Sequence, residues 1–320
     1  GQAGVWLQLD YAVTPVRACA RLEHMSTAAS WTAHGFGGLD DFVLDQREVP
    51  PPGTAEITVD VRAAGVNPAD LKHVQRGSDP ALLPLPIGYE IAGVVTAAGS
   101  GTAFAPGQRV VAFRVRGGYS ETLTIAAADA FVLPGHVDDA AAAGLLLAGC
   151  TAAELLHRCG AGAGETVLLH GASGAVGSAL LQLARLEGVR VVGTASPERQ
   201  EAVRRFGGIP VPYGPGLSER VRAAAPGGVV AALDAAGTAE ATATSLELVQ
   251  DRHRIFTVAA AAAAREHDFV ALAGSAPDSA AYRDSVRGRL VSLLADGSLE
   301  VPIARTFPLA EAREALDLVA

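Results

Sequence analysis

Three glycines spaced three residues apart stand where an apolar run of the chain ends. The segment from Thr166 to Ser178 reads TVLLHGASGAVGS and contains Gly171, Gly174 and Gly177. The apolar run predicts a buried strand, and the apolar residues that follow recur at helical spacing. Such a turn lets an anion approach backbone N–H groups at a helix N-terminus, where the helix dipole adds partial positive charge. The pattern favours a pyrophosphate ligand; a strand-to-helix turn that binds nothing is the alternative.

The glycine pattern departs from the usual dinucleotide-binding fingerprint at one position. It reads Ala172-x-Gly174-x-x-Gly177, so alanine replaces the first glycine, which normally allows a tight turn. Ala175 and Val176 are expected to offer their backbone to the pyrophosphate.

The end of the next expected strand bears on the choice of cofactor. NAD-selective enzymes place an acidic residue there, about 20 residues after the glycines, whereas this chain continues Gly-Thr-Ala-Ser to Ser196. Arg199 would oppose the helix dipole unless an anion lay beside it. A 2′-phosphate facing Ser196 and Arg199 removes that conflict and predicts NADPH. A plain helix cap at Ser196 and an acidic role for Glu198 remain the alternatives.

The elements that must position these residues fall into two kinds. From about Phe42 to Phe131 the chain consists of short strand-like runs such as ITVDVRAAGV, EIAGVVTAAG, QRVVAF and ETLTIAA. After Ala140, apolar strands alternate with amphipathic helices, which predicts a doubly wound parallel sheet. The sequence therefore predicts an α/β protein with a β-rich part and a cofactor-binding part.

Composition excludes several classes of partner. The chain has 25 basic and 34 acidic residues, a net charge of −9, and no long basic run, so we expect no nucleic-acid partner. Its longest uncharged apolar stretch, Ala140 to Ala153, is too short to cross a membrane. Three scattered cysteines suggest neither a disulfide framework nor a structural zinc site, which favours a cytoplasmic protein.

The first residues have no clear periodicity, and Met25 is the single methionine. We interpret residues 1–24 as a leader, an upstream start-site error or an added segment. An ordinary N-terminal extension is the alternative.

The chain resembles the medium-chain dehydrogenase/reductase superfamily and, within it, the zinc-independent quinone oxidoreductases related to zeta-crystallin. The likeness runs from about Phe36 to Ala320 and is carried by AAGVNPADLKHVQRG, GYEIAGVV, GQRVVAF, GGYSETLTI, GCTAAELL, HGASGAVGS and FPLAEAREAL. It implies a GroES-like catalytic domain (25–148 and 285–320), a Rossmann NADPH-binding domain (149–284) and a homodimer. Relatives usually continue into a further strand beyond the last helix, so we expect that this strand is either unrecorded after Ala320 or absent from a truncated protein.

The resemblance also separates the branches of the superfamily by their metal. Alcohol dehydrogenases carry a cysteine zinc ligand where this chain has Asn67 and a histidine ligand where it has Tyr89. We therefore predict no metal. His73, His157 and His170, with Cys150 and Cys159, are expected to be structural or surface residues.

By resemblance, Asn67 would hydrogen-bond near the nicotinamide or the acceptor oxygen, and Lys72 would help to bind that oxygen. A turn residue before Pro68 and a solvated lysine are equally consistent readings. Thr151 would contact the cofactor, Tyr213 would close over its 2′-phosphate, and Val258 would border the nicotinamide. Tyr119 is expected to pack the interior.

Without a metal to polarise an alcohol, the expected reaction is hydride transfer from NADPH to an electrophilic quinone or α,β-unsaturated carbonyl compound. An NADPH-binding structural or regulatory protein with little turnover is the main alternative, because no strong acid, base or nucleophile stands out. A zinc-dependent alcohol dehydrogenase is the third reading.

Overall fold

A computed structural model describes residues 4–8 and 26–319 and divides the chain into two compact units. Ala148–Pro302 form the middle unit; Gly4–Leu147 and Ile303–Ala320 form the flanking unit. The first boundary lies next to the expected one at residue 148. The second lies after Pro302 and not at residue 285, because residue 285 falls inside helix α9 (Pro277–Ala295), which hydrogen-bonds to α3 (Leu146–Cys159) within the middle unit.

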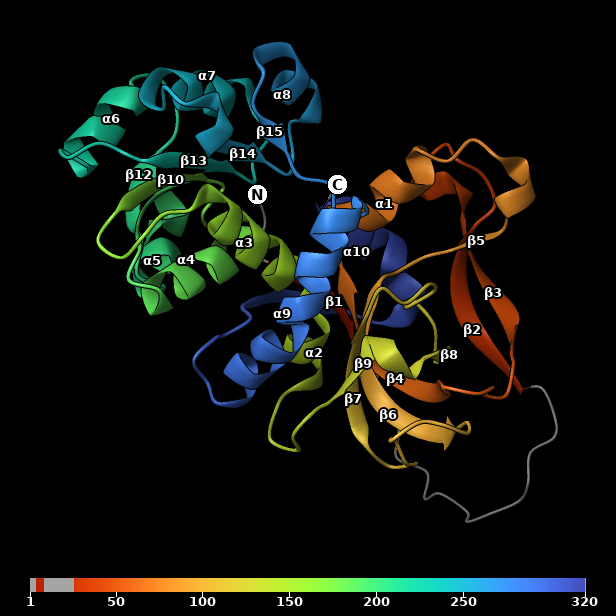
Figure 1. Ribbon diagram of the computed structural model, residues 1–320. Coiled ribbons are helices and arrows are strands. Elements are labelled where there is room, and N and C mark those ends of the chain that lie inside the picture. The colour runs from red at the N-terminus through yellow and green to blue at the C-terminus, as the bar shows by residue number, and fades with distance from the viewer. Residues whose placement is uncertain (1–3, 9–25, 320) are drawn as a thin grey trace. The chain divides into compact units, whose positions relative to one another are not determined.

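The middle unit contains a parallel sheet, as its alternating sequence predicts. Its strand order is β12-β11-β10-β13-β14-β15, so the order reverses between β10 and β13. Figure 1 shows α4 and α5 on one face of this sheet and α6, α7 and α8 on the other. The bounds are β10 Thr166–His170, α4 Ala175–Leu186, β11 Arg190–Ala195, α5 Gln200–Arg205, β12 Ile209–Pro212, α6 Leu217–Ala224, β13 Ala231–Asp234, α7 Ala239–Leu248, β14 Ile255–Thr257, α8 Ala261–His267 and β15 Val270–Ala271.

The flanking unit is β-rich, again as predicted. A seven-stranded sheet runs β16-β1-β4-β6-β7-β9 with β8 also paired to β4, and a three-stranded sheet runs β3-β2-β5. The bounds are β1 Gly4–Gln8, β2 Ser26–Ala33, β3 Phe42–Val49, β4 Glu56–Val66, α1 Pro68–Gln75, β5 Leu85–Pro86, β6 Glu90–Ala98, β7 Arg109–Phe113, β8 Thr122–Ala126, β9 Ala130–Val132, α2 Asp139–Ala143, β16 Ile303–Phe307 and α10 Ala312–Val319.

Strand β1 lies within the segment that the sequence suggests is a leader. Gly4–Gln8 pairs antiparallel with β4 and parallel with β16, so these residues are part of the sheet. Residues 1–3 and 9–24, which belong to the same predicted segment, lie outside the described residues.

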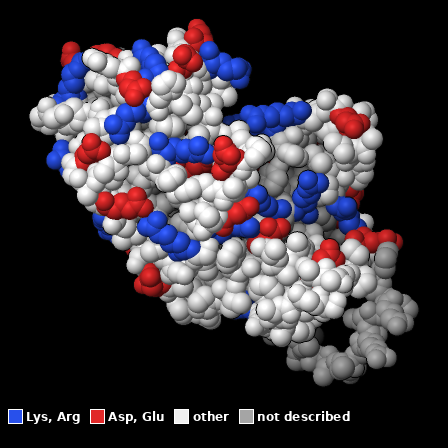
Figure 2. Space-filling view, viewed as in Figure 1, with Lys and Arg blue, Asp and Glu red and all other residues white. Residues whose placement is uncertain are grey.

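Each unit buries its own apolar core. Fully buried side chains of the flanking unit include Phe42, Ile57, Ile91 and Tyr119, and those of the middle unit include Leu168. No helix among the described residues is long and apolar enough to cross a membrane. On the face shown in Figure 2, basic and acidic side chains alternate and form no continuous basic track.

Candidate functional site

The glycine turn leaves β10 at the point where the strand order of the middle unit reverses, a position where open α/β sheets bind their ligands. Gly171 takes the left-handed conformation, with φ of 76°. Its N–H donates to Thr194 Oγ1 at 3.1 Å, and the Ala172 N–H donates to the Thr194 carbonyl oxygen at 3.0 Å. The tight bend therefore falls on Gly171, and the alanine at 172 does not obstruct it.

Two further glycines permit close packing around this turn. A Cβ atom on Gly177 would lie 2.3 Å from the Gly171 carbonyl oxygen, so only glycine lets α4 approach β10 so closely. A Cβ atom on Gly193 would lie 2.6 Å from the Cβ of Ala172. The bare backbone at Gly193 therefore makes room for the alanine that departs from the fingerprint.

The N-terminus of α4 is available to a ligand. Gly174 is the N-cap residue, and within the described part of the chain no side chain caps this helix. The N–H groups of Ala175, Val176 and Gly177 occupy the first turn, where an α-helix offers no internal acceptor. Together with the positive end of the helix dipole, they form an arrangement suited to a phosphate group.

Three predicted cofactor residues lie at the ends of neighbouring strands. Ser196 and Arg199 follow β11, and Tyr213 follows β12, which runs parallel to β11. Arg199 is half-buried, and Tyr213 has an exposed fraction of 58%. The ends of parallel strands meet at one edge of the sheet, so the fold brings these residues to the edge that carries the glycine turn.

Glu198 stands beside this group. The pKa of Glu198 is lowered by its own backbone N–H and by a hydrogen bond from the Ser196 side chain. Ser196 is also the N-cap residue of the short helix Pro197–Arg199, but its side chain makes no capping bond to the backbone. The hydroxyl that the sequence assigns to a 2′-phosphate therefore binds a carboxylate in this structure.

A buried polar network, which the sequence does not predict, surrounds the end of β13 at the same edge of the sheet. Asp234, the last residue of β13, accepts the N–H groups of Ala236 and Gly237 at 2.9 and 2.8 Å and the Thr257 hydroxyl at 2.8 Å. Val258 follows β14 and donates its N–H to the Asp234 carbonyl oxygen at 3.0 Å. A lone aspartate at the end of the apolar run VVAALD was the available signal.

His170 and Thr151 also belong to the middle unit. Burial lowers the pKa of His170 to about 4, against the opposing charges of Asp234 and Glu240, so the ring is neutral. His170 Nε2 lies 3.1 Å from the Ser245 hydroxyl, which supports the expected structural role. Thr151 is buried in α3 and does not lie at a strand end with the other predicted cofactor residues.

The flanking unit brings Asn67 into a second buried network. Asn67 is the N-cap residue of α1 and directly precedes Pro68, the first residue of that helix. Its N–H donates to Asp70 Oδ2 at 2.7 Å, and its Nδ2 donates to Glu90 Oε1 at 2.9 Å. The Tyr119 hydroxyl also donates to Asp70 Oδ2 at 2.9 Å, and the Leu147 N–H donates to Glu90 Oε2 at 2.9 Å.

The two carboxyl groups of this network titrate far above their ordinary range. Burial raises the pKa of Asp70 to about 7 and that of Glu90 to about 8, although each accepts hydrogen bonds that act in the opposite direction. Asp70 Oδ1 is buried without a hydrogen-bond partner among the described residues, and an unsolvated oxygen of this kind disfavours the charged form. Tyr119 is fully buried, as expected for an interior residue.

Lys72 and Tyr89 lie near Asn67 but are not part of its network. Lys72 is exposed on α1, and Tyr89 is half-buried one residue before β6. Burial raises the pKa of Tyr89, so its phenol keeps its proton at neutral pH. Among the described residues, no group of three His, Cys, Asp or Glu side chains is arranged to hold a metal ion.

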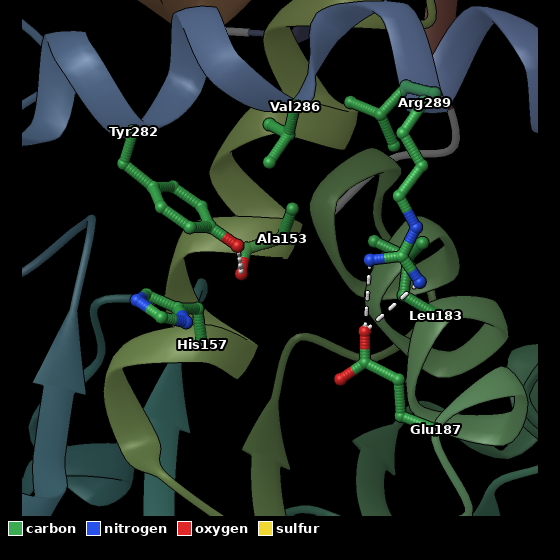
Figure 3. A pocket seen from close by; sticks show the side chains of 8 residues that line it. Ala153, His157, Leu183, Glu187, Tyr282, Val286 and Arg289 are labelled. Carbon is green, nitrogen blue, oxygen red and sulfur yellow. Dashed lines mark hydrogen bonds and ion pairs between the residues drawn. The ribbon is translucent and has the colours of Figure 1, made fainter.

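A pocket of about 130 Å³ in the middle unit lies between α3, α4 and α9 (Figure 3). The rings of His157 and Tyr282 stack along one side with centroids 4.4 Å apart, and Arg289 binds Glu187 at 3.2 Å on the other. Because Glu187 pairs with Arg289, the one guanidinium among the described lining residues is already neutralised. The pocket is therefore not built for an anion, and the glycine turn does not line it. We assign no ligand to it.

Known proteins share both units. Residues 53–154 match the family model of the alcohol dehydrogenase GroES-like domain, and residues 175–290 match that of the zinc-binding dehydrogenase. The synaptic vesicle membrane protein VAT-1 homolog of Rattus norvegicus is 37% identical over 232 residues, 70% of this chain and 57% of that protein. The quinone oxidoreductase of Rattus norvegicus is 39% identical over 169 residues, 51% of each chain.

A solved structure extends the likeness over nearly the whole chain. The Escherichia coli quinone oxidoreductase complexed with NADPH superposes with a TM-score of 0.80 at 25% identity, covering 91% of this chain and 96% of that one. The fold and the glycine turn define a medium-chain dehydrogenase/reductase, and the chain belongs to that superfamily. Within it, the chain is similar to quinone oxidoreductases in sequence and in structure. It spans little more than half the length of the curated relatives it matches.

Proposed function

We propose that this protein is an NADPH-dependent oxidoreductase that reduces a quinone or an α,β-unsaturated carbonyl compound. The observation that carries the proposal is the glycine turn at the switch point of the parallel sheet, which opens into the uncapped N-terminus of α4. The relative from Escherichia coli was solved with NADPH, and its name and that of the rat relative specify quinone reduction.

The residues present fit the cofactor. Gly177 and Gly193 leave the space in which the turn forms, and the first-turn N–H groups of Ala175 and Val176 would bind the pyrophosphate. Arg199 forms no ion pair or hydrogen bond within the described residues, so its guanidinium is available to a 2′-phosphate. Tyr213 is exposed at the end of the adjacent strand and would cover the adenosine.

When bound, NADPH supplies a hydride to an electrophilic carbon of the acceptor. In the flanking unit, Asn67 and Lys72 would bind the acceptor oxygen, on which negative charge develops. The Lys72 ammonium is exposed and would stabilise that charge. Asp70 and Glu90 would hold the Asn67 backbone and amide in place, since each accepts one of its hydrogen bonds. The proton then comes from water or a nearby donor.

We further propose that the reaction needs no zinc. The Asn67 amide is bound to Glu90, and the raised pKa of Tyr89 keeps its phenol protonated, so neither position offers the thiolate or imidazole that zinc prefers. The donor set does not fit the metal, although the second matching family model carries the description of a zinc-binding dehydrogenase.

The test is NADPH oxidation by the full chain with phenanthrenequinone and with a small enone as acceptors. The proposal predicts acceptor-dependent oxidation that is lost in Gly177→Val, whose side chain would enter the turn. NADPH binding without turnover of either acceptor would favour the binding-protein alternative. Turnover of a simple alcohol with NADP⁺, but of neither acceptor, would contradict the proposed reaction.

A further inference from the structure

An exposed arginine in the flanking unit lies opposite the chain segment that carries Tyr89. The Val115 N–H donates to the Tyr89 carbonyl oxygen at 3.1 Å, and the Gly117 N–H donates to the Gly88 carbonyl oxygen at 3.2 Å. These two bonds fix Arg116 across from Gly88 and Tyr89. Gly88 and Gly117 both have positive φ, 97° and 92°, so the bends that bring the two segments together depend on glycine.

His73 completes a cluster with Arg116 and Tyr89. The ring of His73 meets the ring of Tyr89 edge to face, with centroids 5.5 Å apart. Burial lowers the pKa of His73, and the positive charge of Arg116 lowers it further. The same charge acts on Tyr89, where it opposes the larger effect of burial on the pKa. The imidazole and the phenol are therefore in contact, and the guanidinium lies close enough for its charge to act on both.

This cluster borders the residues to which the proposed function assigns the acceptor. Tyr89 directly precedes Glu90, whose carboxyl group binds the Asn67 amide. His73 directly follows Lys72 on α1, the helix that Asn67 caps. Asp70, on the same helix, lies close enough for its charge to influence the pKa of Tyr89.

The charge of the cluster is uncompensated. Within the described residues, neither Arg116 nor Lys72 forms an ion pair, and both side chains are exposed. Asp70, whose charge acts on Tyr89, and Glu90, which directly follows Tyr89, have pKa values raised to about 7 and 8. At pH 7 Glu90 is therefore mostly protonated and Asp70 about half protonated. A locally positive surface in a chain with a net charge of −9 favours an anionic ligand.

We propose that Arg116, together with His73 and Tyr89, binds a carboxylate of the acceptor, so that the preferred substrate is a quinone or enone that carries a carboxylate group. The guanidinium pairs with a carboxylate through two parallel hydrogen bonds, and the Tyr89 ring packs against the conjugated part of the molecule. This inference rests on the proposed function, because it names the acceptor class of the same reaction.

The experiment compares 4-oxopent-2-enoate with its methyl ester as acceptors, using the full chain and saturating NADPH. Arg116→Gln should raise the KM of the acid about tenfold, which corresponds to about 1.4 kcal/mol, and the KM of the ester much less. Arg116→Lys should recover part of the lost affinity for the acid. Arg305→Gln is the matched control; it removes the same charge from an exposed position on β16 and should change neither KM.

The outcomes separate this inference from the function on which it rests. Reduction of the ester with an equal effect of Arg116→Gln on both acceptors would overturn the inference and leave the proposed function standing. A purely structural role for Arg116 would give that result too. Reduction of neither acceptor, nor of phenanthrenequinone, would contradict the proposed function and this inference with it. Increasing salt should raise the KM of the acid for the wild type and should raise it less for Arg116→Gln.

Discussion

At the scale of single residues, we propose that Glu198 and Arg199 determine which cofactor binds at the end of β11. The Ser196 side chain is hydrogen-bonded to Glu198, and Arg199 is the neighbouring cation. A 2′-phosphate would be attracted by the charge of Arg199 and repelled by that of Glu198, whereas a 2′-hydroxyl could donate a hydrogen bond to Glu198. We therefore propose that the selectivity between NADPH and NADH depends on the opposite charges of two adjacent residues, three and four positions after the end of β11.

This balance gives a first prediction. Arg199→Ala should weaken NADPH binding about tenfold and affect NADH little, because one charge-assisted contact to the phosphate is lost. Glu198→Gln should shift the preference toward NADPH. Titration of each variant with both cofactors measures the effect, with Arg204→Ala as the control, since Arg204 pairs with Glu201 on the exposed surface. Parallel losses for NADPH and NADH in Arg199→Ala would contradict the assignment.

Asp70 and Glu90 give a second prediction, on the pH dependence of stability. Their folded-state pKa values, about 7 and 8, lie above the ordinary values of 3.8 and 4.5. Between those limits the folded state holds more protons than the unfolded state, so their contribution to stability is complete below about pH 4 and falls as the pH rises toward 8.

Unfolding in urea, followed by the fluorescence of buried Trp31 in the flanking unit, measures this effect. The transition midpoint of the wild type should fall between pH 5 and pH 8 more steeply than that of Glu90→Gln, which cannot ionise. Identical slopes would show that Glu90 is charged in the folded state at neutral pH.

The sequence identifies residues whose role is local and misses those whose role depends on distant contacts. The glycine turn could be located because strand, turn and helix are contiguous. The hydrogen-bond partners in the Asn67 network could not be located in this way. Glu90, which binds Asn67, is 23 residues away in the sequence, and Tyr119, which binds Asp70, is 49 residues away. The left-handed bend at Gly171, and the compensation of Ala172 by Gly193 on the next strand, also required the folded sheet.

At the scale of elements, the contact between the turn and β11 gives a third prediction. Gly193→Ala should destabilise the protein by about 1–3 kcal/mol, because the added methyl group would overlap the Ala172 side chain. Ala172→Gly removes that side chain, so the double variant should recover part of the loss, although Val203 remains close to the new methyl group. Thermal unfolding of the two single variants and the double variant measures the coupling. Strictly additive losses would contradict the proposed compensation.

The sequence predicts the order of the helices and strands along the chain better than it predicts which strands pair with one another. The strands ITVDVRAAGV, EIAGVVTAAG and TVLLH and the helix that begins at Ala175 are confirmed, because period and turn residues define each of them locally. Strand β1 was not predicted, since GVWLQ is short and its place between β4 and β16 depends on residues from opposite ends of the chain.

At the scale of the whole molecule, the matching family model describes a zinc-binding dehydrogenase. Asn67 and Tyr89, in contrast, do not offer the side chains that zinc prefers. The chain keeps the fold of that family, but the fold alone does not specify the chemistry of the site. The homodimer and the cytoplasmic location that the sequence suggests remain predictions.

The fourth prediction concerns this metal. Purified protein should contain far less than one zinc ion per chain by elemental analysis, and prolonged dialysis against a chelator should leave the rate of acceptor reduction and the thermal midpoint unchanged. One equivalent of zinc, with activity that a chelator removes and zinc restores, would place the protein with the metal-dependent alcohol dehydrogenases.

The central claim is that the turn from Gly171 to Gly177 binds the pyrophosphate of NADPH, and calorimetric titration of the folded full chain tests it most directly. NADPH should bind with one site per chain and more tightly than NADH, and Gly177→Val should lose binding of both while the flanking unit, reported by Trp31, stays folded. If wild-type protein bound neither cofactor, or if Gly177→Val bound NADPH as tightly as the wild type, the claim would be wrong.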